Sequence, residues 1–170
     1  ETEIRHLMDT FKESPVTMSQ PWIRSLEGGF YARTPVLLQN GDYKWIHELC
    51  VGDLLYNPKK QMNENKENSI LSIIQIHDSP LYTHRLVNGD YIHGGIHNTY
   101  LWEGRLYTTR QNTYVTNEMI IENEEDVLLS FKRKDSCVLY HILTTQGIFY
   151  ISPSMKCLDY NGNIETYLKK

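Results

Sequence analysis

The side chains in this chain that are best suited to covalent chemistry are its thiols. Cys50, Cys137 and Cys157 are widely spaced and contain no C-x-x-C pair, which argues against both a disulfide framework and a zinc knuckle. The charge of Lys156 would lower the pKa of a thiol at position 157. Cys157 nevertheless alternates with apolar residues in a predicted strand over 151–158, which favours a packed structural thiol. Reduced cysteines of this kind favour a reducing, cytosolic-type environment.

The histidine with the most informative context is His97, in the segment NGDYIHGGIHNTYL from Asn88 to Leu101. A histidine can donate a proton near neutral pH and so act as a general acid. His93 lies four residues earlier, but a turn region does not place the two rings on one helix face, and no acidic or thiol ligand flanks them. We therefore predict no metal site. The sequence also lacks a nucleophile elbow and a glycine-rich phosphate loop, so we predict no cofactor.

The segment from Gly28 to Leu55 predicts a compact β unit that would position such residues. Its parts, in chain order, are a short apolar run over 34–38, a hairpin turn at Asn40-Gly41, a return strand through 43–46, and a second turn at Gly52-Asp53. Asn-Gly between two strand-like runs is a strong hairpin signal.

This unit resembles the opening block of the Hint fold, which inteins, Hedgehog autoprocessing domains and von Willebrand-associated Hint modules share. The family pattern begins with a nucleophilic Cys and a Thr five residues later, followed by V…dG…I..L..GD. The matching residues are Thr34, Val36, Gly41, Ile46, Leu49, Gly52 and Asp53. Gly29 stands where the family has its Cys, so the chain resembles a degenerate member.

A second family block, G..I..T..H, falls in the segment that contains His97. Gly89, Ile92 and His97 fit it, whereas Gly94 stands at the Thr position. The resemblance implies a site for an N-to-S acyl shift at Gly29, with Thr34 nearby, Gly94 in place of the assisting Thr, and His97 as the surviving acid. A thiol and a proton donor are needed because an amide is a poor electrophile and an amine is a poor leaving group.

Inteins complete protein splicing at a terminal His-Asn followed by Cys, Ser or Thr. His97-Asn98-Thr99 spells that triad, but it lies in mid-chain, and we interpret it as a coincidence. Near the C-terminus the sequence has no His-Asn pair, and Asn163 is followed by Ile164, which hinders side-chain cyclisation.

A weak internal repeat supports a fold made of two similar halves. LYTHRLVNG at Leu81 to Gly89 aligns without gaps with LYHILTTQG at Leu139 to Gly147. Met155 aligns with His97, so only the first copy could hold the acid. In the Hint family such halves are related by a pseudo-two-fold axis. From the residues alone we expect two similar antiparallel hairpins that pack face to face.

Composition favours a mostly β protein of ordinary domain size. The chain has 170 residues, of which 11% are aromatic, and twelve of the aromatic residues are tyrosines. Aromatic and β-branched residues favour strands. We expect a Hint-like antiparallel β domain over 28–170. The segment 1–27 would hold a short amphipathic helix, predicted over 1–13 from apolar residues at helical spacing, and a flanking stretch.

Charge and hydropathy set expectations for partners. The net charge of -4 is mild and its signs are interspersed, so we predict neither nucleic-acid nor membrane binding. The basic cluster Lys132 to Lys134 predicts a solvated strand end or hairpin tip rather than a phosphate site. Flanking domains of the same chain or a separate protein are the expected partners.

Three hypotheses about function remain open on the sequence alone. The first is a degenerate Hint-like domain, without enzymatic activity, that serves as a structural or protein-interaction module of a larger viral or eukaryotic protein. The second is an autoprocessing domain whose nucleophilic Cys was replaced at Gly29. The third is an unrelated antiparallel β module that binds proteins.

Overall fold

The computed structural model describes residues 16–18, 28–58, 66–109, 119–120 and 130–168. Within these ranges the chain consists mostly of antiparallel strands with one short α-helix. The mostly β architecture predicted from sequence is thereby confirmed. The helix expected over 1–13 lies outside the described residues, and the domain boundary at residue 27 stays a prediction.

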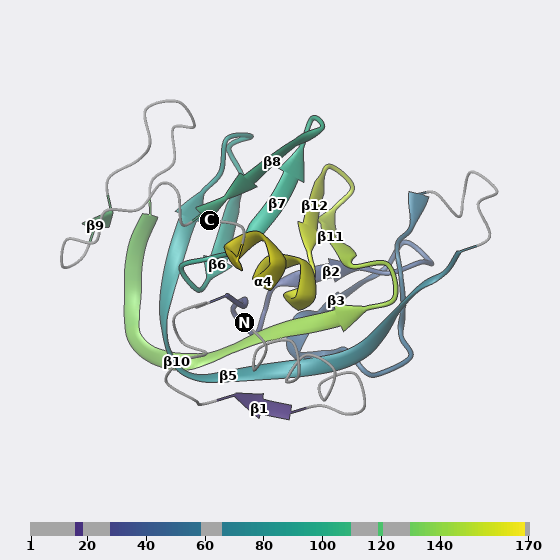
Figure 1. Cartoon of the computed structure of the whole chain (residues 1–170), viewed down its shortest axis with the longest axis horizontal. Helices are drawn as coiled ribbons and strands as arrows, with labels where there is room; N and C mark the ends of the chain where they lie inside the picture. The colour runs from purple at the N-terminus through teal and green to yellow at the C-terminus, as the bar shows by residue number, and fades with distance from the viewer. Residues whose placement is uncertain (1–15, 19–27, 59–65, 110–118, 121–129, 169–170) are drawn as a thin grey trace.

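Two long strands form the backbone of the fold. β5 (Asn68–Arg85) and β10 (Ser130–Thr144) pair antiparallel over most of their lengths, and Figure 1 shows them curving together around the rest of the domain. β5 also pairs with β1 (Val16–Met18), β4 (Leu54–Leu55) and β6 (Tyr91–Gly94), and β10 pairs with β9 (Met119–Ile120).

A second sheet lies inside the curve of the long strands. Its strand order is β11 (Ile148–Ser152), β12 (Met155–Leu158), β7 (Thr99–Trp102) and β8 (Arg105–Thr108). The helix α4 (Tyr160–Leu168) follows β12 and contacts β7 and β12 of this sheet as well as β10 of the long pair. It lies in front of the strands in the view of Figure 1. The core packs between the two sheets, with Phe30 and Phe149 in an edge-to-face contact at 5.5 Å between ring centroids.

The two halves of the repeat meet across the β5–β10 ladder. Ser79 pairs with Cys137, and Asp78 accepts a hydrogen bond from the Ser136 hydroxyl at 3.4 Å across a separation of 58 residues. This separation equals the offset of the sequence repeat, since 139 minus 81 is also 58. Residues that correspond in the two copies therefore face each other here, as they must where a pseudo-two-fold axis crosses an antiparallel pair.

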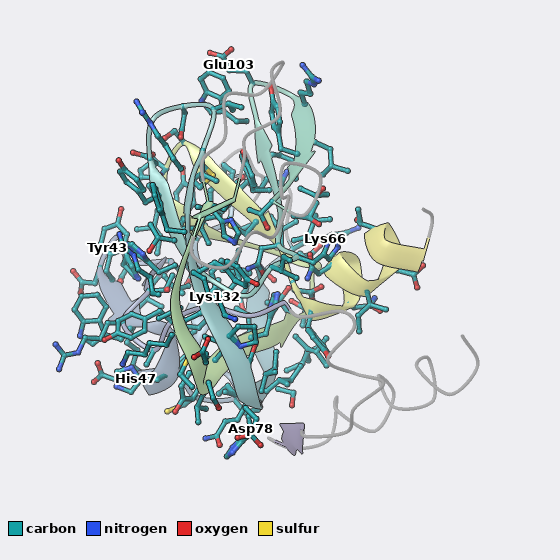
Figure 2. All side chains as sticks on the ribbon, turned by 90° about the vertical axis from the view of Figure 1, so that its left-hand side faces the viewer. Tyr43, His47, Lys66, Asp78, Glu103 and Lys132 are labelled. Carbon is teal, nitrogen blue, oxygen red and sulfur yellow. The ribbon has the colours of Figure 1, made fainter. Side chains whose placement is uncertain are left out.

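Both long strands bend at this axis. Asp78 has a positive φ of 54°, and the register of the ladder shifts between Lys134 and Leu139. Shifts of this kind are β-bulges, which bend a strand and increase its twist. Figure 2 places Asp78 at the end of the domain opposite Glu103, the residue at the tip of the β7–β8 turn.

The opening block folds as the sequence predicts. β2 (Pro35–Leu37) and β3 (Tyr43–Trp45) form the hairpin, followed by a 3-10 turn, η1 (Ile46–Glu48). Gly41 and Gly52 have φ values of 90° and 92°, a conformation that glycine adopts without steric cost. Lys44 Nζ, 2.9 Å from an Asp53 carboxylate oxygen, ties the hairpin to the second turn.

No helix in the described part of the chain combines the length and the apolarity that a membrane span requires.

Candidate functional site

The candidate site is centred on Gly29, whose two backbone polar groups are both bound by one side chain. The Gly29 N–H donates to Asn98 Oδ1 at 3.1 Å, and Asn98 Nδ2 donates to the Gly29 carbonyl oxygen at 2.9 Å. The same carbonyl accepts a second bond from the Gly95 N–H at 2.9 Å. Asn98 is 1% exposed, so these bonds form away from water and fix the orientation of its amide.

The conformation of Gly29 leaves no room for a side chain. Its φ is +102°, which residues with a Cβ rarely adopt. A Cβ built there would lie 2.9 Å from Ile76 Cδ1 and 3.2 Å from Leu139 Cβ. β5 and β10 therefore close the position at which the Hint family would have its nucleophile.

Gly94 lies directly against the backbone of Gly29, next to the peptide junction between Gly28 and Gly29. It is the last residue of β6 and forms an isolated bridge with Phe30. A Cβ on Gly94 would overlap the carbonyl oxygen of Gly29. Gly94 thus permits a close approach of two backbones, which no larger residue allows.

His97 and Asn163 close the other side of the junction. Asn163 Nδ2 donates to the His97 carbonyl at 2.7 Å, and its Oδ1 accepts from the Thr99 hydroxyl at 2.8 Å. The His97 ring lies with Nε2 3.2 Å from the Asn163 carbonyl oxygen, which assigns the proton to Nε2. A Cβ on Gly28 would lie only 2.5 Å from Asn163 Nδ2, so the first turn of α4 covers the residue before Gly29.

His141 is a second buried histidine next to this site. Its ring packs at 5.2 Å from Phe30 and 5.3 Å from Tyr160, centroid to centroid. Its Nδ1 accepts a bond from the Ile142 N–H at 3.0 Å. Burial, with the nearby His97 as a lesser cause, lowers the pKa of His141 to about 3, so the ring is neutral at physiological pH.

His84 supports the site from β5. Its Nε2 donates to the Gly95 carbonyl at 2.8 Å, while its Nδ1 faces the Ser130 hydroxyl. Burial lowers the pKa of His84 to about 4, and the ring remains neutral. His84 therefore positions Gly95, whose N–H in turn binds the carbonyl of Gly29.

The structure brings together three of the four sequence-predicted site residues. Gly29 and Gly94 are in contact, and the chain at His97 passes beside Gly28. Thr34 lies at the entry to β2, where its carbonyl accepts from the Ile46 N–H at 2.8 Å. Thr34 also lines a separate surface pocket with Arg33 and His93; the described contacts at Gly29 do not include it.

The thiols lie apart from the contacts made by Gly29. Cys157 is fully buried in the hydrophobic core, and burial raises the pKa of its thiol far above the usual range. The packed structural thiol predicted from the strand pattern is confirmed. Cys50 is exposed, and Cys137 is partly buried on β10 with a raised pKa caused by desolvation. Among the described residues, no three His, Cys, Asp or Glu side chains are placed to hold a metal ion.

Sequence reasoning missed Asn98 and Asn163. Both were considered only as parts of a terminal splicing motif, whereas here one binds the Gly29 backbone and the other binds the His97 backbone. These contacts span 69 and 66 residues, a distance over which local patterns carry no signal. The one available hint was the position of Asn98 directly after His97 in the second family block.

Solved structures provide the relatives of this fold, since neither a protein-family model nor a curated protein matches the sequence. The DnaB intein from Synechocystis sp. PCC 6803 aligns with 78% of this chain and 98% of its own, at 11% identity and a TM-score of 0.54. The Ssp DnaB mini-intein variant M86 aligns with 78% of this chain and 94% of its own, at 10% identity and a TM-score of 0.54.

The gp41-1 intein gives a similar result, with 17% identity, a TM-score of 0.51 and coverage of 78% of this chain and 98% of its own. At such identities the likeness concerns the fold. The hypothesis of an unrelated antiparallel β fold does not agree with these alignments. The arrangement of the strands confirms the Hint-like antiparallel β fold expected from the sequence. The chain therefore has the Hint fold found in inteins.

Proposed function

We propose that this domain keeps the Hint fold without cleaving its own chain, and that it serves as a structural or protein-interaction module of a larger protein. The observation that carries the proposal is the state of position 29. There a positive φ, together with close contacts from β5 and β10, admits glycine and opposes a cysteine. An acyl shift at this position needs a nucleophilic side chain at residue 29, and glycine has none.

The other thiols give this reading further support. A thiolate, and not a thiol, is the attacking species. Burial raises the pKa of Cys157 and, to a lesser degree, of Cys137, so both favour the unreactive thiol form. Cys50 lies exposed beyond η1, where its Sγ contacts the Glu48 carbonyl at 3.7 Å.

A surface on the opening hairpin fits the role of an interaction module. Tyr43 is 49% exposed and Trp45 is 43% exposed, and Figure 2 shows Tyr43 and His47 on the outer edge of the domain. Tyr43 and Trp45 line one hollow together with Pro35. Exposed aromatic side chains are enriched at protein interfaces, so this hairpin is the part we assign to contact with a partner or a flanking domain.

An autoprocessing domain with its nucleophile replaced at Gly29 is the second candidate. It is favoured by the buried polar groups that still surround the junction, namely His97, Asn98 and Asn163. In this reading the site would be intact apart from its sulfur. The Gly29→Cys variant separates the two candidates, because it restores the thiol and tests whether the site accepts it.

The experiment measures thiol-induced cleavage of Gly29→Cys on a reducing gel and by mass spectrometry, with Gly29→Ala as the matched control for folding. Our proposal predicts that both variants lose stability to a similar extent and that neither is cleaved. A folded but uncleaved Gly29→Cys protein also supports it. Thiol-dependent cleavage between residues 28 and 29 would establish the second candidate instead.

A further inference from the structure

A hollow with several polar side chains in its lining lies on the outer face where β6, β5 and β10 run side by side. Its lining consists of Tyr31, Leu81, Thr83, His93, Arg133 and Lys134, around a volume of about 400 Å³. In the ladder, Thr83 pairs with His93 of β6 on one side and with Phe131 of β10 on the other. Figure 2 shows this end of β10, marked by Lys132, on the face turned toward the reader.

The three basic residues of β10, Lys132 to Lys134, have different surroundings. Lys132 forms an ion pair with Asp135 at 3.0 Å, whereas Arg133 and Lys134 line the hollow. Arg133 is the extra residue at a shift of register between Lys132 and Lys134, and bulges of this kind redirect a side chain. Position 133 is therefore built into the sheet and is not a free strand end.

A chain of hydrogen bonds orients the donors of the hollow. Arg133 Nε donates to the Thr83 hydroxyl at 3.0 Å, and the same hydroxyl is hydrogen-bonded to His93 Nδ1 at 2.9 Å. Because the bond from Arg133 already occupies a lone pair of the hydroxyl, we assign the hydroxyl proton to the bond with Nδ1 and the proton of the neutral His93 ring to Nε2. Partial burial, followed by the charge of Arg133, lowers the pKa of His93, which favours the neutral form of the ring.

The lining of the hollow is rich in donors and contains no carboxylate. Two basic side chains, Arg133 and Lys134, face it, and neither forms an ion pair with a described residue. Asp90 lines the adjoining pocket that shares His93, but not this hollow. The Thr83 oxygen is already occupied by Arg133 and His93, so a ligand would meet guanidinium, ammonium, imidazole N–H and phenol groups.

We propose that this hollow binds an oxyanion of the phosphate class. The planar guanidinium of Arg133 suits paired bonds to phosphate oxygens, and its Nε bond to Thr83 holds it in one orientation. Lys134 supplies a second positive charge. His93 supplies an N–H donor from a neutral ring, so no charge on the imidazole has to be desolvated. The same chemistry could come from free phosphate or from a phosphorylated side chain of a protein partner. This site is independent of the proposed loss of self-cleavage.

The test is a titration of the full chain with inorganic phosphate, followed by amide chemical shifts in NMR and by calorimetry at constant ionic strength. Sodium chloride serves as the reference anion, and a short phosphoserine peptide forms a second arm. The key variant is Arg133→Gln. Its matched control is Arg105→Gln, because Arg105 is also an exposed strand arginine beside an aromatic ring. The guanidinium carbon of Arg105 lies 5.0 Å from the Tyr107 ring centroid, and that of Arg133 lies 5.7 Å from the Phe131 ring centroid.

We expect saturable binding of one phosphate, with shifts at Thr83 and His93 that chloride does not reproduce. Arg133→Gln should weaken binding about tenfold or more, since it removes the charge-assisted hydrogen bonds of the guanidinium to the anion. Arg105→Gln should leave it unchanged. Tighter binding of the peptide than of free phosphate would identify a phosphorylated partner, and the reverse order would identify a small anion; both support the site.

Two results would overturn the proposal. One is phosphate binding no stronger than that of chloride. The other is an equal effect of the two arginine variants, which would reveal nonspecific charge attraction. Thermal unfolding of each variant accompanies the titration, and Lys134→Gln provides a second lining variant if Arg133→Gln does not fold.

Discussion

Asn98 binds both backbone polar groups of Gly29, accepting from its N–H at 3.1 Å and donating to its carbonyl oxygen at 2.9 Å. A single amide thus holds the residue at which the Hint family begins its chemistry. Because the contact is buried, it contributes to folding as well as to the geometry of the site.

Replacement of this amide by a carboxylate of nearly the same size should be costly. In Asn98→Asp a carboxylate oxygen would face the Gly29 carbonyl in place of the Nδ2 donor. We expect a loss of about 3 kcal/mol in the free energy of unfolding, measured with urea, because buried polar groups would be left unpaired. Asn161→Asp, at an exposed position in the first turn of α4, should be neutral or slightly stabilising. Equal effects would argue against the Gly29 contact.

Gly29 and Gly41 offer a matched pair for the steric argument. Both have positive φ, 102° and 90°, but a Cβ on Gly41 would meet nothing within 4 Å. Gly41→Ala should therefore lose only the backbone term of about 1 kcal/mol, whereas Gly29→Ala should lose about 3 kcal/mol because it also meets Ile76 and Leu139. Chemical unfolding of the two variants measures the difference. Similar losses would mean that position 29 tolerates a side chain.

Much of the scaffold was predictable from sequence because it depends on local chemistry. The turn at Asn40-Gly41 requires positive φ, and the apolar runs beside it have the alternation of strands. The repeat also carried long-range information, since its offset of 58 residues reappears as the contact between Asp78 and Ser136.

The site itself was less predictable, because sequence patterns do not reveal which polar groups meet. His97 was identified by motif position, but its partner Asn163 lies 66 residues away. The cluster Lys132 to Lys134, expected at a solvated strand end or hairpin tip, lies near the start of β10 and is paired with β5, so it is not a hairpin tip. Such pairing depends on tertiary contacts that override local charge patterns.

The buried carboxylate of Asp159 should be important for the position of α4. Its oxygens accept from the Thr144 N–H at 2.9 Å and from the Gly162 N–H at 2.9 Å, so it caps the helix and joins it to β10. Asp159→Ala should lower the free energy of unfolding by about 2–3 kcal/mol. The control Asp135→Ala removes a carboxylate that is 93% exposed, and its effect should stay within about 0.5 kcal/mol. Calorimetric unfolding of both variants would reveal no difference if the cap were unimportant.

Acid should destabilise the fold through two of its buried histidines, His84 and His141. Burial lowers the pKa of His84 to about 4 and that of His141 to about 3, below the ordinary 6.5. The unfolded chain therefore binds protons first, and the stability present above pH 6.5 is lost as the pH falls toward the folded pKa values. At about pH 5 each histidine should cost about 2 kcal/mol. Burial raises the pKa of Asp159, which offsets part of this loss.

Urea unfolding at about pH 7 and pH 5 measures this dependence, and His141→Phe isolates one contribution. The phenyl ring suits the aromatic surroundings formed by Phe30, Phe149 and Tyr160. The variant should lose roughly half of the pH dependence, since it removes one of the two histidines whose pKa is lowered this far. An unchanged dependence would show that His141 is not the titrating group.

The most direct measurement is the intact mass of the natural chain during long incubation at 37 °C in reducing buffer. If Gly29 has ended self-cleavage in this Hint fold, the spectrum keeps the single species of 20.0 kDa. Fragments that end at Gly28 or at Asn163, absent from a chemically unfolded control, would contradict the account.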